Sequence, residues 1–198
     1  MFTIPAGITE GEQVDCGWLV VPEEHANPSG PTIKLGVAII RSTSLNVRPD
    51  PLVMAQGGPG GSTIDYYTQV LFYSRLLKNR DIILFDQRGT LYSEPNLICP
   101  ESLEKSIELL NVDLETEEVE AASREAALAC RERLVGEGVN LSAYNSLENA
   151  ADVNALRQAL GYEQVNLYGV SYGTLLALHT MRDYPEALRS VILDAVVP

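Results

Sequence analysis

The sequence predicts an α/β protein with a mostly parallel central sheet, and three observations support this class. Apolar, β-rich runs alternate along the chain with helical patterns, as they do in α/β domains. The run at 81–86 (DIILFD) is apolar without polar alternation, which is expected for a parallel strand covered on both faces. The segment at 166–174 (NLYGVSYGT) is a strand that ends in Gly-x-Ser-x-Gly and leads at once into a helical pattern.

Length, charge and hydropathy limit the classes of protein to consider. A chain of 198 residues is long enough for one well-buried domain and short for two. The net charge of -13 argues against nucleic acid or an anionic membrane surface as a partner. No stretch approaches about 18 consecutive apolar residues, so we predict no transmembrane helix. The first residues have neither the basic nor the apolar region of a signal peptide.

The first 41 residues predict a β-hairpin. The runs at 13–21 and 32–41 are rich in β-forming residues, and the segment 22–31 between them carries the turn-forming sequence NPSG. His25 lies in this connection, where we expect a solvated loop histidine.

A short apolar strand at 51–55 leads into a glycine-rich loop at 56–62, and a core-packing helix is expected at about 63–77. Four glycines in this loop let backbone N–H groups approach a ligand closely. A phosphate loop is one use, but the Lys-Ser/Thr ending of that motif is absent. An oxyanion loop fits the downstream serine, and a plain flexible loop is the remaining alternative.

The buried strand at 81–86 runs into a polar loop at 87–95. Asp86 and Arg88 stand two positions apart at the end of the strand. We expect them to hold the loop together through a charged hydrogen bond rather than to act directly in catalysis.

Between about 99 and 138 the pattern becomes helical and acidic. The segments 103–110 and 117–134 predict helices in an excursion on the flank of the sheet. Their charges are expected to form a solvated helix face. Ser146 is then expected to be the N-cap of the next helix, which Gly161 ends.

The Gly-x-Ser-x-Gly segment predicts a nucleophile elbow centred on Ser171. Gly169 and Gly173 leave room for a sharp turn that lifts the Ser171 hydroxyl clear of the sheet. The next helix, which Pro185 ends, directs its N-terminus at the same spot, so the N–H of Tyr172 can stabilise an oxyanion. The alternative is a glycine-rich turn with an incidental serine. A last strand is predicted at 190–194.

The three cysteines are Cys16, Cys99 and Cys130. An odd count permits at most one internal pair. From the sequence alone, three free thiols in a cytoplasmic protein remain an alternative.

Three motifs now follow one another at the ends of successive strands: 57–60 (GGPG), 86–89 (DQRG) and 166–174. On these residues the chain resembles the α/β-hydrolase fold and, more narrowly, the proline-iminopeptidase and tripeptidyl-aminopeptidase group of serine exopeptidases. The segments 16–23 (CGWLVVPE) and 150–157 (AADVNALR) also look like the tripeptidyl branch. The resemblance covers nearly all of the chain.

The resemblance implies a role for several residues. Ser171 matches the nucleophile, and the N–H groups of Tyr172 and Gly58 match the two oxyanion-hole donors. The implied reaction is acyl transfer on a peptide or a small ester or amide, with no metal or organic cofactor. Cys99 and Cys130 match a pair that forms a disulfide in related sequences, which favours an exported or extracellular protein.

The resemblance also leaves the catalytic triad incomplete. The only histidine after Ser171 is His179, eight helical positions on and about 12 Å along the axis, so we expect a packing or surface residue. Asp194 stands where some hydrolases place their acid. We therefore expect residues 1–198 to be the N-terminal portion of a single α/β-hydrolase domain. Its usual acid, histidine and cap would lie beyond the last residue, and the chain alone would have little or no peptidase activity.

Two other functions stay open from the sequence. One is a carboxylesterase-type α/β-hydrolase that uses the same elbow on esters. The other is a non-catalytic α/β-hydrolase-like half that binds a partner, such as the missing C-terminal half, through an exposed strand edge and apolar faces.

Overall fold

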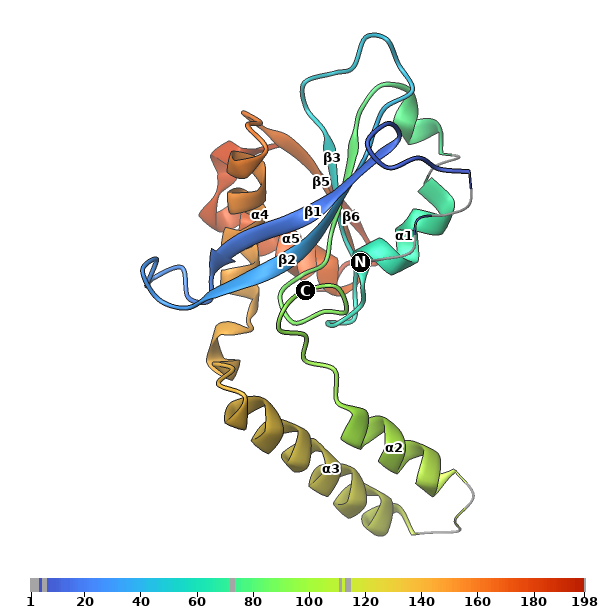
Figure 1. The fold of residues 1–198 in the computed structure, drawn as a ribbon, viewed down its shortest axis with the longest axis vertical. Coiled ribbons are helices and arrows are strands. Elements are labelled where there is room, and N and C mark those ends of the chain that lie inside the picture. Colours follow the sequence, from blue (N-terminus) through green and yellow to red (C-terminus); the bar gives the residue numbers. More distant parts are fainter. Residues whose placement is uncertain (1–3, 5–6, 72–73, 111, 113–114, 198) are drawn as a thin grey trace. The chain divides into compact units, whose positions relative to one another are not determined.

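The computed structural model describes residues 4, 7–71, 74–110, 112 and 115–197, and the chain divides into two compact units. The first unit comprises Met1–Asn96 and Ala143–Pro198, and it contains the sheet. The second unit, Leu97–Ser142, contains the helical segment that the sequence predicts between 99 and 138 (Figure 1).

The first unit is built on one six-stranded sheet with the order β1-β2-β4-β3-β5-β6. Its strands are β1 (Val14–Pro22), β2 (Thr32–Ile40), β3 (Leu52–Ala55), β4 (Ile82–Phe85), β5 (Val165–Val170) and β6 (Leu188–Asp194). β1 pairs antiparallel with β2, and β2 pairs antiparallel with β4, whereas the pairs β4–β3, β3–β5 and β5–β6 are parallel. The predicted α/β class with antiparallel N-terminal strands is therefore confirmed.

Three α-helices cover the two faces of this sheet (Figure 1): α1 (Thr63–Leu71), α4 (Ser146–Ala159) and α5 (Tyr172–Asp183). Strand residues alternate between the faces, so Val53 and Ile83 pack with residues of α4 and α5, whereas Met54 and Leu84 pack with residues of α1. β3 and β4 are buried along their whole length, as the uninterrupted apolar run at 81–86 predicts.

Two local predictions about helix ends are wrong. The helix expected at 63–77 ends at Leu71 in the structure, and a separate 3₁₀ turn, η1, occupies Arg75–Lys78. The N-cap of α4 is Asn145 rather than Ser146, because the Asn145 side chain accepts hydrogen bonds from the N–H groups of Leu147 and Glu148. Ser146 is the first helical residue, and its hydroxyl shares a hydrogen bond of 2.9 Å with the Tyr172 hydroxyl.

Short 3₁₀ turns complete the connections: η2 (Leu141–Ala143) and η3 (Pro185–Ala187). η3 contains the proline that the sequence predicts to end α5, and β6 begins directly after it. Within the described ranges, no helix combines the length and the apolar character that crossing a membrane would require.

The second unit is a hairpin of two helices, α2 (Pro100–Leu109) and α3 (Thr116–Gly136). A disulfide joins Cys99 and Cys130, whose Cα atoms are 5.4 Å apart. Arg133 adds a second link between the helices, because its guanidinium donates to a carboxylate oxygen of Glu101 at 2.6 Å and to the carbonyl oxygen of Ile98 at 2.9 Å. α2 buries no residue, so these links compensate for a small apolar core.

Candidate active site

The predicted elbow is a strained turn between β5 and α5. Ser171 has φ 53° and ψ -122°, a backbone conformation that residues other than glycine rarely adopt. Its N–H donates to the carbonyl oxygen of Asp194 at 2.9 Å, and its carbonyl oxygen accepts from the N–H of Thr174 at 2.8 Å and from the Thr174 hydroxyl at 2.6 Å. The surrounding hydrogen bonds therefore hold Ser171 in this conformation.

The two glycines of the elbow allow three elements to meet without side chains between them. A Cβ atom on Gly173 would lie 2.1 Å from the carbonyl oxygen of Ala55, at the end of β3. A Cβ atom on Gly169 would lie 2.3 Å from the carbonyl oxygen of Gly173. Because both obstacles are backbone atoms, no side-chain rearrangement could make room. These contacts set the close approach of α5 to the carboxyl ends of β3 and β5.

The glycine-rich loop after β3 lies directly against the elbow. A Cβ atom on Gly57 would lie 2.7 Å from Cβ of Ser171 and 3.2 Å from its Oγ. The Gln87 side chain, which is buried, holds the start of this loop by donating to the carbonyl oxygen of Gln56 at 2.9 Å. Gln87 belongs to the DQRG motif, but its role was not predicted from the sequence.

The backbone N–H groups of the glycine-rich loop and the elbow differ in whether they already donate a hydrogen bond. The N–H of Gly57 donates to its neighbour's side-chain oxygen, Gln56 Oε1, at 2.9 Å. Across the described part of the chain, the N–H groups of Gly58 and Tyr172 have no hydrogen-bond partner. Tyr172 opens α5, where the helix leaves its first N–H groups unpaired and carries partial positive charge. One unpaired donor, the N–H of Tyr172, thus follows Ser171 directly in the chain, and the other belongs to Gly58, which follows the Gly57 that lies against Ser171.

Asp86 fixes the loop after β4 to the start of α1. Its buried carboxylate accepts hydrogen bonds from the Ser62 hydroxyl at 2.9 Å, the N–H of Ile64 at 3.0 Å and the N–H of Tyr92 at 2.9 Å. Burial raises the pKa of Asp86 above its usual value, although these hydrogen bonds oppose the rise. The prediction of a hydrogen bond between Asp86 and Arg88 is wrong. The Asp86 carboxylate accepts from these three donors instead, and the Arg88 guanidinium donates to a side chain of α4.

Arg88 and His25 meet at one carboxylate that the sequence analysis missed, Asp152 of α4. Arg88 binds Asp152 through Nε and Nη2, both at 2.8 Å, and His25 Nε2 lies 2.8 Å from the Asp152 Oδ1. The N–H of His25 also donates to a carboxylate oxygen of Glu148. The prediction of a solvated His25 is therefore wrong. The partner lies 127 residues away in the sequence, so only the tertiary fold brings the two together.

Neither histidine of the chain is hydrogen-bonded to Ser171 in the described structure. His25 is bound to Asp152, and His179 lies on α5 with a buried Nδ1 that has no partner among the described residues. Asp194 accepts a hydrogen bond of 2.6 Å from the Tyr168 hydroxyl, which raises the pKa of Tyr168 to about 12. The Ser171 turn therefore has a positioned serine and unpaired donors, and no histidine side chain is hydrogen-bonded to the serine among the described residues.

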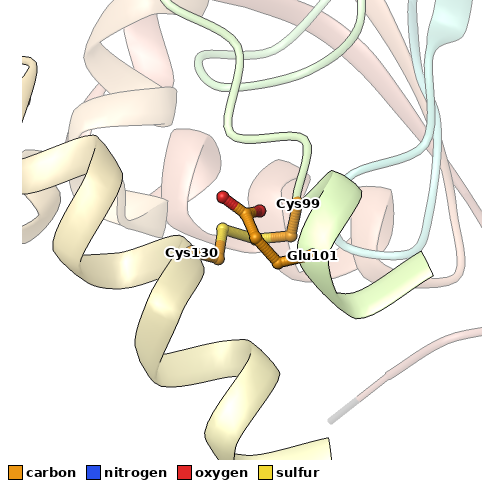
Figure 2. Close-up of side chains that lie close together, drawn as sticks. All are labelled: Cys99, Glu101 and Cys130. Atoms are coloured by element: carbon orange, nitrogen blue, oxygen red, sulfur yellow. A yellow bond between two sulfur atoms is a disulfide. The ribbon is translucent and has the colours of Figure 1, made fainter. Parts of the chain in front are cut away.

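One cluster outside the elbow has the residue types of a metal site. The side chains of Cys99, Cys130 and Glu101 lie close together (Figure 2). Their ligand atoms are all within 4.8 Å of one another. The two sulfur atoms are bonded to each other and are not thiolates, the form that binds zinc. Glu101 accepts from Arg133, which lowers the pKa of its carboxylate. This cluster is a structural link between α2 and α3.

A serine held at positive φ between a parallel strand and a helix, with a glycine loop against it, is the arrangement of the nucleophile elbow in the α/β-hydrolase fold. The chain belongs to the alpha/beta hydrolase fold family, whose sequence model matches residues 50–198. It is similar to a solved Pseudomonas aeruginosa structure, provisionally named an epoxide hydrolase, with a TM-score of 0.53 and 16% identity over 100% of this chain and 44% of that one. At this identity the likeness concerns the fold.

Curated relatives have a higher sequence identity to this chain. The tripeptidyl aminopeptidase of Streptomyces coelicolor is 31% identical over 193 residues, 93% of this chain and 35% of that protein. Serine protease Hip1 of Mycobacterium tuberculosis is 30% identical, over 92% of this chain and 36% of that protein. Carboxylesterase B of the same species is 31% identical over 97 residues, 48% of this chain and 18% of that protein. The chain thus spans about a third of the length of the first two.

Proposed function

We propose that Ser171 is the nucleophile of a serine exopeptidase that releases N-terminal amino acids or short peptides through an acyl-enzyme. The observation that carries this proposal is the contact between the glycine loop and the strained serine, with Gly57 against Cβ and Oγ of Ser171. The names of two relatives that align over most of the chain, an aminopeptidase and a serine protease, support peptides as substrates.

In the proposed mechanism, Ser171 Oγ attacks the scissile carbonyl carbon and forms a tetrahedral intermediate. The N–H groups of Gly58 and Tyr172 stabilise the oxyanion, because they have no competing acceptor within the described residues. The C–N bond then breaks, the amine leaves with a proton, and water hydrolyses the acyl-enzyme. The fixed backbone donors and the helix N-terminus would supply electrostatic stabilisation that requires no rearrangement during the reaction.

We further propose that the general base comes from residues outside this sequence. A serine hydroxyl without a base stays protonated at neutral pH and is a weak nucleophile. The edge strand β6 could pair with such residues, because it pairs only with β5 in the described sheet and exposes Ile192. Parallel strands added at this edge would bring further loops to the carboxyl ends of the strands, where Ser171 lies. The substrate-selecting region would come from the same source.

Labelling with a fluorophosphonate probe tests both parts of the proposal. We expect residues 1–198 alone to fold and to remain unlabelled. A chimera in which they replace the matching segment of the Streptomyces coelicolor enzyme should be labelled and should cleave a tripeptidyl amide. Ser171→Ala in the chimera should abolish both signals. A folded Ser171→Ala chimera that labels as strongly as its parent would refute the nucleophile, and Ser171-dependent labelling of the isolated chain would refute an external base.

A carboxylesterase is the second candidate, supported by the similarity to carboxylesterase B over 97 residues. Peptide and ester hydrolysis would use the same elbow and oxyanion donors, so the site does not separate them. Rates on matched tripeptidyl anilide and short-chain ester substrates would do so. Turnover of the ester alone, lost with Ser171→Ala, would favour the esterase. If the folded chimera turns over neither substrate, the result would favour a non-catalytic binding role.

A further inference from the structure

Helix α2 has two nearly opposite faces, and only one of them is packed. Ser102, Lys105 and Leu109 are half-buried and recur at intervals of three and four residues, which marks the face toward α3. Leu103, Ile107 and Leu110 recur at four and three residues on the other face, with exposures of 62%, 56% and 78%. We call these three residues the α2 stripe. Leu110 is the C-cap residue and keeps a helical backbone, so it continues the row.

The α2 stripe has the spacing of a helix-packing seam but no partner among the described residues. Three large side chains at i, i+4 and i+7 are the anchor pattern of a helix that packs against another helix. Leaving them in water forgoes the free energy that their burial would supply. The opposite face of the same helix already packs against α3. The α2 stripe is therefore a second apolar face of the helix, distinct from the face that packs against α3, and it has no partner among the described residues.

The α2 stripe has negative charge along one side and lies in an acidic unit. Glu104 and Glu108 each follow a stripe residue by one position, so their carboxylates border the stripe along one side. Lys105 pairs with Glu108 at 2.6 Å. The segment 97–142 contains eleven acidic and four basic residues, a net charge of -7 out of the chain's -13. A second copy of this unit would bring like charges together, whereas a basic helix would be attracted.

We propose that the α2 stripe is a docking surface for a basic amphipathic helix of a partner polypeptide. The partner's apolar residues would pack against Leu103, Ile107 and Leu110, and its lysines or arginines would face Glu104 and Glu108. The disulfide of Cys99 with Cys130 and the Arg133–Glu101 bond hold α2 on α3 before the partner arrives. A preformed surface avoids the entropy cost of ordering α2 during binding. The site is independent of Ser171 chemistry.

The test uses the 198-residue chain and a labelled leucine–lysine peptide about 18 residues long, with leucines every three or four positions. Fluorescence anisotropy should detect binding that weakens as ionic strength rises. The double substitution Leu103→Ser with Ile107→Ser should weaken binding by about tenfold or more. Leu128→Ser, at an exposed leucine of α3 outside the stripe, should leave binding unchanged. Far-UV circular dichroism should be the same for all three proteins, because the replaced side chains are exposed.

Three results would overturn the proposal. If a scrambled peptide of the same composition binds equally well, peptide binding would be due to general charge attraction. Equal peptide affinity of the double variant and the parent chain would place the binding elsewhere. Sedimentation that shows a dimer of the parent chain, dissociated by the double substitution, would make the occupant a second copy of this chain.

Discussion

Arg88 and Asp152 form a bidentate ion pair in which both side chains are fully buried, with Nε and Nη2 of Arg88 each 2.8 Å from an Asp152 oxygen. The remaining nitrogen, Nη1, donates to the carbonyl oxygens of Glu23 and Ala143. The guanidinium therefore joins the β1–β2 connection, the loop after β4, η2 and the middle of α4. Each of these oxygen atoms therefore has a donor as long as the Arg88 guanidinium is present.

Replacement of Arg88 by methionine should lower the free energy of unfolding by about 3–5 kcal/mol, because Asp152 would be left buried without its counter-charge. Arg88→Lys should recover part of this loss, since it keeps the charge but not the two-pronged geometry. Urea unfolding followed by far-UV circular dichroism measures the effect. The fluorescence of Trp18 is not suitable, because the ammonium of Lys34, the residue replaced in the control, lies 5.8 Å from the centroid of that ring. As a control, Lys34→Met removes an exposed pair with Glu94 and should cost at most about 1 kcal/mol. Equal losses for Arg88→Met and Lys34→Met would contradict this assignment.

Two glycine-to-alanine substitutions should change stability in opposite directions. Gly173→Ala places a methyl group 2.1 Å from the carbonyl oxygen of Ala55 and should destabilise the first unit by about 2 kcal/mol or more. Gly136→Ala lies in α3 with no atom within 4 Å of the new methyl group. It should stabilise that helix by up to about 1 kcal/mol, since alanine is the better helix former. Hydrogen exchange resolves the two units separately. Unchanged exchange in β3 and α5 of Gly173→Ala would show that the elbow tolerates a side chain.

The Asp50 carboxylate should stabilise the first unit, and this contribution should be lost in acid. Burial alone would raise its pKa, but hydrogen bonds from Asn166 and Arg80 and the charges of Arg80 and Arg189 lower it below the ordinary 3.8. A carboxylate with a lowered pKa contributes stability that is present above pH 3.8 and is lost as pH falls through the folded-state value. Urea unfolding between neutral pH and about pH 3 should therefore show a shallower acid loss in Asp50→Asn than in the parent chain. Identical pH profiles would exclude this role.

The cysteines should show two very different reactivities. Under non-reducing denaturing conditions one thiol, Cys16, should react with a thiol reagent, and three should react after reduction. In the folded chain, burial and the neighbouring Glu10 raise the pKa of the Cys16 thiol to about 12, so its alkylation at neutral pH should be slow.

Reduction should act on the second unit, where it releases a closed loop with a sequence separation of 31. By chain entropy the loss is about 3.7 kcal/mol. Hydrogen exchange of α2 should therefore accelerate while β3 and β4 stay protected. Three titratable thiols before reduction would contradict the disulfide.

The elbow and the class of fold could be predicted from the sequence because they depend on local chemistry. Backbone atoms leave no space for a side chain at Gly169 and Gly173, so glycine is required at both positions. The requirement is therefore visible in the sequence motif itself. Strand residues in uninterrupted apolar runs indicate a sheet covered on both faces, and turn residues mark where the elements end.

The ion pairs could not be predicted in this way. Asp152 lies 64 residues from Arg88 and 127 residues from His25, and each of the three looks like an ordinary loop or helix residue in its own segment. Sequence proximity instead suggests a bond between Asp86 and Arg88, and that prediction is wrong. Burial decides such partners, because a charge removed from water must bind whichever opposite charge or dipole the fold places beside it.

The amino-acid sequence by itself therefore determined the order of strands and helices, the Ser171 turn and the glycines around it, since these follow from allowed backbone conformations and side-chain periodicity. The tertiary structure alone decided which charged groups are paired, which N–H groups remain unpaired beside the serine, and which face of α2 is exposed. These properties depend on atoms brought together from distant segments, and only the packed chain specifies them.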